Sequence, residues 1–167
     1  MYLVGKKISL CTSFDVANEY KKIAEQDLKA AQLLKDNGLY NEAYYYYIQS
    51  MEKSIKSRIC EIVDVTNPFF ANEMKRIGHS LDAAIEFLLR LVSGNNEVLY
   101  QHIKKQILED VLKEIRFSSL HNNVRYPYFN SYKNEYVYLN ITSNDCNAIE
   151  QMEKNLKAFV ESLYRIK

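Results

Sequence analysis

The sequence predicts an all-α protein, and two observations carry that prediction. Gly occurs four times and Pro twice among 167 residues, so the turn residues that sheets need are scarce and good helix formers dominate. Apolar residues also recur at three- and four-residue steps along most of the chain, as amphipathic helices require. We expect an up-and-down bundle of four to five helices with a long irregular loop before the last helix. A single domain would span residues 1–167, with an N-terminal extension over about 1–13 and the loop over about 118–143.

The first two helices are predicted to form a hairpin. Asp15 is a suitable N-cap for a helix that runs to Asn37, and Gly38 then supplies the left-handed residue that ends it. The second helix runs from Leu39 to about Asp64 with the same apolar spacing. Because the turn between them is so short, the two helices are antiparallel neighbours.

The middle of the chain is predicted to add two more helices. Pro68 breaks the helical pattern and begins a loop. Ser80 can cap a short and very apolar helix, LDAAIEFLLRLV, which must be buried on most sides. After an SGNN turn, a fourth helix is expected from Glu97 to about Phe117.

The loop at 118–143 separates the fourth helix from the last one, which follows the TSN segment at 142–144. Roughly 25 residues here lack a helical period, which is long for a connection in a compact domain, so the loop is expected to be functional or packed. Over residues 136–141, aliphatic side chains alternate with Tyr and Asn. Part of the loop is therefore expected to lie extended with the aliphatic side chains inward, and no sheet is predicted.

Composition narrows the possible functions. Lys and Arg number 22 against 21 Asp and Glu, so nucleic acid could be attracted only by a local patch. Three widely spaced Cys without a CxxC pair indicate neither disulfides nor zinc, and we expect no metal and no cofactor. No apolar run suits a signal peptide or a membrane span, so a cytoplasmic protein without membrane contact is expected. The sequence also lacks metalloprotease, P-loop and GxSxG hydrolase motifs.

Four sequence elements occur in the order typical of one family. The residues in the first two helices are Glu19, Ala24, Asp27, Leu28, Ala31, Leu34, Gly38, Tyr40, Ala43, Gln49, Glu52, Lys53 and Lys56. They follow a DL-containing helix, then G-x-Y-x-x-A, then Q-x-x-EK-x-x-K. The GHSL segment at 78–81 is similar to a later H-D-L segment with Ser in place of Asp, and RYP at 125–127 is similar to an RYP segment before the last helix. Together these elements resemble the HEPN domain.

The resemblance implies a helical bundle that commonly forms a two-fold homodimer. Some HEPN domains accompany a minimal nucleotidyltransferase, as a partner chain or a fused domain, and help to hold nucleotide or substrate. Others are metal-independent endoribonucleases, including toxins of toxin–antitoxin pairs and effectors of antiviral defence. We expect a nucleotide- or RNA-binding module paired with a nucleotidyltransferase-type partner. The alternatives are an endoribonuclease, with an antitoxin as its possible partner, and a protein-binding helical adaptor.

The ribonuclease signature is an Arg followed, after four to six residues, by a His, and Arg116 and His121 satisfy this spacing. If the protein is an enzyme, His121 would move a proton near neutral pH and Arg116 would stabilise charge growing on the phosphate. Two departures count against this assignment. Phe117 stands where ribonuclease members usually have a polar residue, and His121 lies four residues before RYP, where non-catalytic relatives often have Tyr. In the alternative interpretation, Arg116 ends a helix and His121 bonds to backbone.

Four residues are candidates for binding nucleotide or RNA: Lys113, Arg125, Tyr126 and Tyr128. Arg125 would hold a phosphate while Tyr126 or Tyr128 stacks on a base. Lys113 belongs to a basic segment at 101–133, where six Lys or Arg against three Asp or Glu leave a net charge of +3. In the alternative interpretation the RYP segment is structural, and Arg125 bonds helix-end carbonyls.

Two further groups in the helical hairpin have open roles. Asp27, Glu52 and Lys53 could support a polar site inside it, or form ordinary ion pairs. In the run Tyr44–Tyr47, only one or two rings can reach the core, because four consecutive helical residues point in four directions. The other rings are expected to be exposed, at a partner surface or in simple amphipathic packing.

Overall fold

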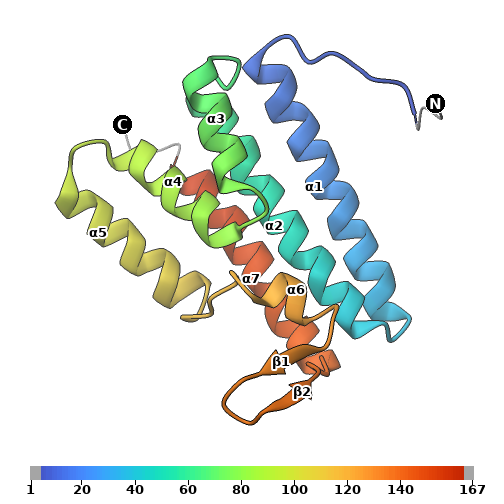
Figure 1. Ribbon diagram of the computed structural model, residues 1–167. Coiled ribbons are helices and arrows are strands. Elements are labelled where there is room, and N and C mark those ends of the chain that lie inside the picture. The colour runs from blue at the N-terminus through green and yellow to red at the C-terminus, as the bar shows by residue number, and fades with distance from the viewer. Residues whose placement is uncertain (1–4, 164–167) are drawn as a thin grey trace.

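Two long antiparallel helices organise the structure, a computed structural model that describes residues 5–163 (Figure 1). α1 (Ser13–Asp36) and α2 (Tyr40–Ile62) are joined by a turn in which Gly38 has a φ of 76°, a left-handed conformation that glycine adopts without strain. The N-cap of α1 is Thr12 rather than Asp15, because the two side chains form a reciprocal capping box. The predicted helical hairpin is confirmed.

The predicted N-terminal extension is described from Gly5 onward. Residues 5–12 precede α1 and form neither helix nor strand. Residues 1–4 of the extension, and residues 164–167 at the other end of the predicted domain, lie outside the described residues.

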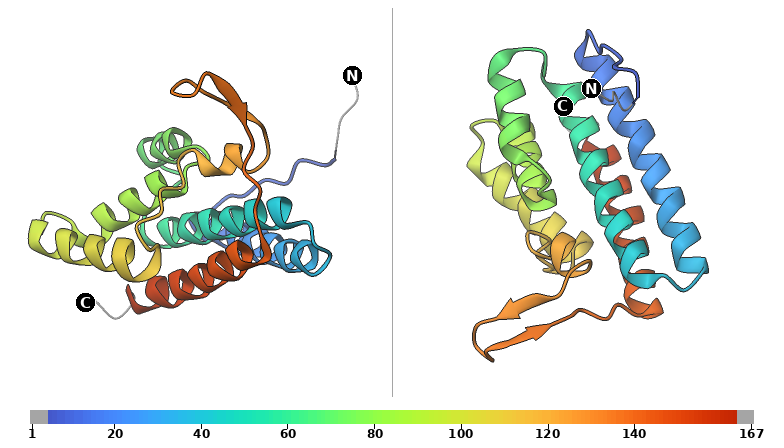
Figure 2. Two further views of the ribbon diagram at one scale, coloured as in Figure 1. Left: turned by 90° about the horizontal axis from the view of Figure 1, so that it is seen from below. Right: turned by 45° about the vertical axis from the view of Figure 1, so that its right-hand side comes forward.

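The core of the bundle is built around α2. This helix packs against α1, against α4 (Leu81–Ser93) and against α7 (Ser143–Ser162), and the views in Figure 2 show it between these neighbours. Thr142 caps α7 through a second capping box, with Asp145. Because helices supply nearly all the regular structure around one large core and a small second cluster, the predicted all-α bundle is confirmed.

The segment after Pro68 is a helix, so the prediction of a loop there is wrong. α3 (Pro68–Ile77) begins with Asn67 as its N-cap, which accepts a hydrogen bond from the backbone N–H of Phe69 at 2.9 Å. Proline suits the first position of a helix because the N–H it lacks would have no partner inside that helix. Ser80 caps α4 as predicted, and its hydroxyl accepts from the backbone N–H of Ala83 at 3.2 Å.

The fourth predicted helix ends earlier than Phe117. α5 (Glu97–Gln106) continues into one π-helical turn, η1 (Ile107–Val111), and the chain then leaves the helix through Lys113 and Glu114, which have φ values of 50° and 62°. Phe117 lies beyond this turn and is fully buried. The backbone N–H of Phe117 also donates to the Asp82 carboxylate of α4, so the chain has turned back toward α4 at this point. Arg116 therefore lies in a loop and does not end a helix.

The long loop is more regular than its sequence indicates. It contains one helical turn, α6 (Leu120–Asn123), and an antiparallel hairpin of β1 (Tyr128–Asn130) with β2 (Glu135–Val137), so the prediction that no sheet forms is wrong. The Asn130 side chain accepts hydrogen bonds from the backbone N–H groups of Tyr132 and Lys133, and this Asx-type turn closes the hairpin. The alternation predicted over 136–141 is confirmed, since the aliphatic side chains there are half-buried and the others exposed.

The tyrosine run in α2 divides between core and surface. Tyr44 and Tyr47 are buried, whereas Tyr45 and Tyr46 are half-buried and pack edge to face with ring centroids 5.4 Å apart. The prediction that only one or two rings reach the core is confirmed, but the expectation that the other two are exposed is wrong, because Tyr45 and Tyr46 pack against the edge of the core. The outward pair lies on the side of α2 that meets the long loop, as the contact of Tyr45 with Arg125 shows.

Candidate functional site

Arg125 lies against two tyrosine rings at the surface. Its guanidinium carbon is 4.5 Å from the ring centroid of Tyr45 on α2 and 5.1 Å from that of Tyr126. Arg125 is exposed, and 54% of Tyr126 is exposed. The geometry favours a cation stacked on aromatic faces. Within residues 5–163, the Arg125 side chain forms no hydrogen bond to a helix-end carbonyl.

Asn41 holds the loop that carries these residues. Its side-chain amide donates to the carbonyls of Val124 and Leu139, both at 2.7 Å, and its side-chain oxygen accepts from the N–H of Ile141 at 3.1 Å. One side chain at the start of α2 thus ties together the two ends of the hairpin segment. The sequence analysis missed Asn41 because nothing local to the second helix shows which distant backbone groups will meet it.

The hairpin carries exposed rings on one face. Phe129 and Tyr136 are cross-strand partners with ring centroids 5.5 Å apart, and Tyr138 lies two residues further along the same face. All three are more than half exposed. Tyr128 pairs with Val137 on the other face and is half-buried. Of the two tyrosines proposed to stack on a base, Tyr126 is therefore the more accessible.

Arg116 borders a cavity of about 350 Å³ between η1, α5 and the loop after η1. The cavity is lined by Gln101, Lys104, Lys105, Leu108, Glu109, Glu114 and Arg116. The nearby carboxylate of Asp82 accepts from the backbone N–H groups of Phe117 and Ser118, at 3.0 Å and 2.7 Å, and so fixes the chain next to Arg116. Arg116 forms no ion pair with any residue in 5–163, so its charge is available to an anion.

Lys104 is less available than Arg116. Hydrogen bonds to the Tyr100 hydroxyl (2.8 Å) and to Glu86 (3.1 Å) raise the pKa of Lys104. Burial raises the pKa of Glu86, but hydrogen bonds from Tyr100 and Lys104 outweigh it and leave that pKa below its usual value. Lys104 and Glu86 both stay charged near neutral pH and pair with each other. Arg116 is therefore the main cation of this cavity without an ion pair in residues 5–163.

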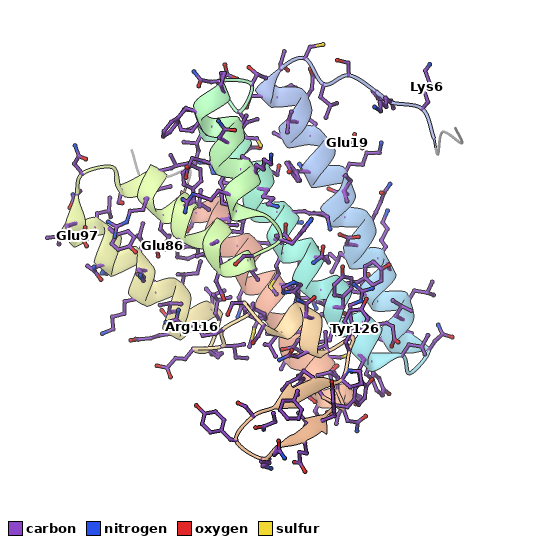
Figure 3. All side chains as sticks on the ribbon, in the orientation of Figure 1. Lys6, Glu19, Glu86, Glu97, Arg116 and Tyr126 are labelled. Atoms are coloured by element: carbon purple, nitrogen blue, oxygen red, sulfur yellow. The ribbon has the colours of Figure 1, made fainter. Side chains whose placement is uncertain are left out.

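Arg116 lies in the loop before α6, and His121 lies on α6. His121 lies half-buried on α6 and forms no hydrogen bond or ion pair with any described residue. In Figure 3, Arg116 and Tyr126 lie on the two sides of α6. Lys113 is exposed in the turn after η1. The candidate residues thus form two groups, one around Arg125 and one around Arg116.

The polar residues of the helical hairpin pair with one another. Lys53 donates to Asp27 at 2.5 Å, and Lys56 donates to one oxygen of Glu52 at 2.6 Å. Glu52 is only 1% exposed, and its other oxygen is buried without a hydrogen bond. His79 approaches Glu52 from the surface, with Nδ1 3.7 Å from the paired oxygen. The Lys53–Asp27 pair joins α2 to α1, and Lys56 also donates to the carbonyl of Gly78 in the turn before α4.

Comparison with known proteins supports the resemblance over the helical hairpin. A family model described as the HEPN domain matches residues 17–64, which span most of α1 and all of α2. This match supports the HEPN resemblance over these residues, which make up less than a third of the chain. Searches of curated proteins and of solved structures found no match.

Within residues 5–163, no three or more His, Cys, Asp or Glu side chains gather as a metal site would require. In the same part of the chain, no helix is both long and apolar enough to cross a membrane.

Proposed function

We propose, starting from the HEPN match over residues 17–64, that this protein is a helical module that binds nucleotide or RNA. The binding surface would be formed by Arg125, Tyr45 and Tyr126 together with the exposed rings of the hairpin. The observation that carries the proposal is the Arg125 guanidinium stacked against two tyrosine rings at the surface.

The chemistry of this surface matches that of a nucleotide. A guanidinium offers several N–H donors in one plane, and those not facing the rings remain able to hold a phosphate. An exposed tyrosine ring next to it can stack on a base, an interaction worth about 1–3 kcal/mol per base in single-strand binding. Phe129 and Tyr136 would extend the aromatic surface along the hairpin. Flexible single strands or isolated nucleotides suit such a surface better than a regular duplex, because their bases are free to stack.

Tyr45 and Arg125 are already held in place in the absence of a ligand. The Tyr45 ring is anchored by α2, and the backbone around Arg125 is anchored by Asn41. A cation held in place loses less conformational freedom on binding than a long side chain in solvent, which favours affinity.

The experiment is a fluorescence anisotropy titration with labelled single-stranded RNA and with labelled ATP, at several salt concentrations. Arg125→Ala should weaken binding and reduce the slope of log K against log salt by about 0.7, the change for one lost phosphate contact on a single strand. Tyr126→Ala should weaken binding by about 1–3 kcal/mol with the slope unchanged. Arg76→Ala is the matched control, because Arg76 is an exposed cation of α3 that pairs only with Glu73. If Arg125→Ala binds as tightly as the wild type, the proposed surface is wrong.

We further propose that the protein is a homodimer and acts beside a nucleotidyltransferase-type chain. The HEPN match supports both proposals, since such domains often dimerise and pair with nucleotidyltransferases. The proposed site would then position nucleotide or RNA for the partner. Sedimentation of the purified protein, alone and with a candidate nucleotidyltransferase, tests each statement separately.

A further inference from the structure

A groove runs along the side of the bundle away from the hairpin. α1 and α7 both pack against α2, and Figure 2 (left) shows α1 and α7 on one side of α2 with α6 and the hairpin on the other. At one end the two flanking helices are tied together by the Lys35–Glu150 ion pair, whose N–O distance is 2.5 Å. From Lys21 to Gln32 on α1 the groove is roughly 16 Å long, at 1.5 Å per helical residue.

The floor of this groove is made of small hydroxyl side chains. Ser50 and Ser54 of α2 line its middle, beside Ala24 and Leu28 of α1. Neither serine hydroxyl forms a hydrogen bond with the described residues. The floor thus offers two free hydroxyls next to apolar walls.

A buried carboxyl group points into the same space. Glu153 of α7 is 5% exposed and lines both the narrow middle of the groove, about 60 Å³, and the wider part beside it, about 310 Å³. Within residues 5–163 it has no hydrogen bond or ion pair. Lys154 and Lys157 lie near enough to act on its charge but do not reach 4 Å, and burial raises the pKa of the Glu153 carboxyl. A buried carboxylate without a partner is costly, and a cation that enters the groove would remove that cost.

We propose that this groove binds a small aliphatic amine, with the Glu153 carboxylate as the counter-ion of its ammonium group. Ser50 and Ser54 would accept the remaining ammonium hydrogen bonds, and the alkyl chain would lie against Ala24 and Leu28. The narrow middle holds an alkyl chain but not a helix, whose diameter is about 10 Å. A divalent metal ion is a poorer match, because it seeks several oxygen ligands and no three His, Cys, Asp or Glu side chains gather as a metal site within residues 5–163.

The alternative is that Lys157, one helical turn after Glu153 and lining the same groove, swings in to pair with it. In that case a free amine would find the carboxylate occupied. If Lys157 occupies the carboxylate, the wild type should not bind the amine and Lys157→Ala should gain binding. If the carboxylate is open, the wild type should already bind the amine.

The test uses isothermal titration of the full-length protein with 1,4-diaminobutane, and with 1,4-butanediol as the neutral probe of the same length. The wild type should bind the diamine and not the diol. Glu153→Gln keeps the shape of the side chain and should weaken diamine binding about tenfold or more, whereas Glu135→Gln, on the exposed hairpin outside the groove, should change it less than about twofold. Circular dichroism of each variant checks that it is folded. Absence of diamine binding to both the wild type and Lys157→Ala, or equal binding by Glu153→Gln, would overturn the proposal. The outcome is independent of RNA binding at Arg125, which lies across α2.

Discussion

Asn41 should control both the stability of the fold and the order of the hairpin. Its side chain makes three hydrogen bonds to backbone groups that are 83 to 100 residues away in the sequence. At about 0.5–1.5 kcal/mol of net stability for each, Asn41→Ala should lower the free energy of unfolding by about 3 kcal/mol. For a protein of this size that corresponds to a fall in Tm of roughly 6–12 °C.

The measurement is urea unfolding followed by circular dichroism, combined with amide hydrogen exchange. Exchange should accelerate most in residues 124–141, because Asn41 ties that segment to α2, whereas the helical hairpin should change less. Asn41→Asp is a second, more specific variant. It keeps the oxygen that accepts from the N–H of Ile141 but places an oxygen against the carbonyls of Val124 and Leu139. It should therefore lower the free energy of unfolding about as much as Asn41→Ala does. Asn147→Ala is the control, since Asn147 is exposed on α7 and should change stability by no more than about 0.5 kcal/mol. If Asn41→Ala unfolds at the wild-type urea concentration, the reasoning that one side chain positions the site is refuted.

Four further predictions follow from the same structure. If the protein is a ribonuclease, it should cut single-stranded RNA in EDTA and His121→Ala should abolish cutting without changing Tm; activity that persists in that variant removes the catalytic assignment of His121 and Arg116. Phe117→Ala should cost about 3–5 kcal/mol of stability in urea unfolding, because the ring is buried in the core, and a cost below about 1 kcal/mol would contradict that burial. Thr142→Ala should cost about 1 kcal/mol by removing the capping box of α7, unless the helix is held only by its packing. Burial raises the pKa of Glu153, so the folded state favours the protonated carboxyl and stability should fall as pH rises through that pKa. Glu153→Gln should therefore stabilise the protein at neutral pH and have little effect near pH 4. A loss of stability at neutral pH would show that the carboxylate has a partner.

The outer helices were predictable because their signals are local. The spacing of apolar residues, the glycine at the end of α1 and the polar residues before α4 and α7 act within a few positions of one another. The same logic failed at Pro68, where a residue that ends helices also starts them. It failed again after η1, because the helix stops where the Phe117 ring enters the core and not where the apolar spacing ends.

The candidate site could be predicted only in part. The sequence identified Arg125 and Tyr126 from their type and from the RYP pattern, but it did not indicate Tyr45 as their neighbour or Asn41 as their anchor. Those partners lie about 80 positions earlier in the chain, and no sequence period joins them. The Glu153 groove was missed for the same reason, since a carboxylate on an amphipathic helix looks like any solvated residue until its neighbours are known.

By itself, then, the sequence determined the helical class, the antiparallel pairing of α1 with α2, the capping of α4 and the resemblance to the HEPN domain, since each depends on residues close together in the chain. Only the tertiary structure decided that the loop before α7 folds into a hairpin, that Arg125 stacks on a ring from α2, and that Glu153 is buried with no hydrogen-bond or ion-pair partner in residues 5–163. The physical reason is that burial and long-range hydrogen bonds depend on which surfaces meet after the helices pack, and a one-dimensional pattern does not contain that information.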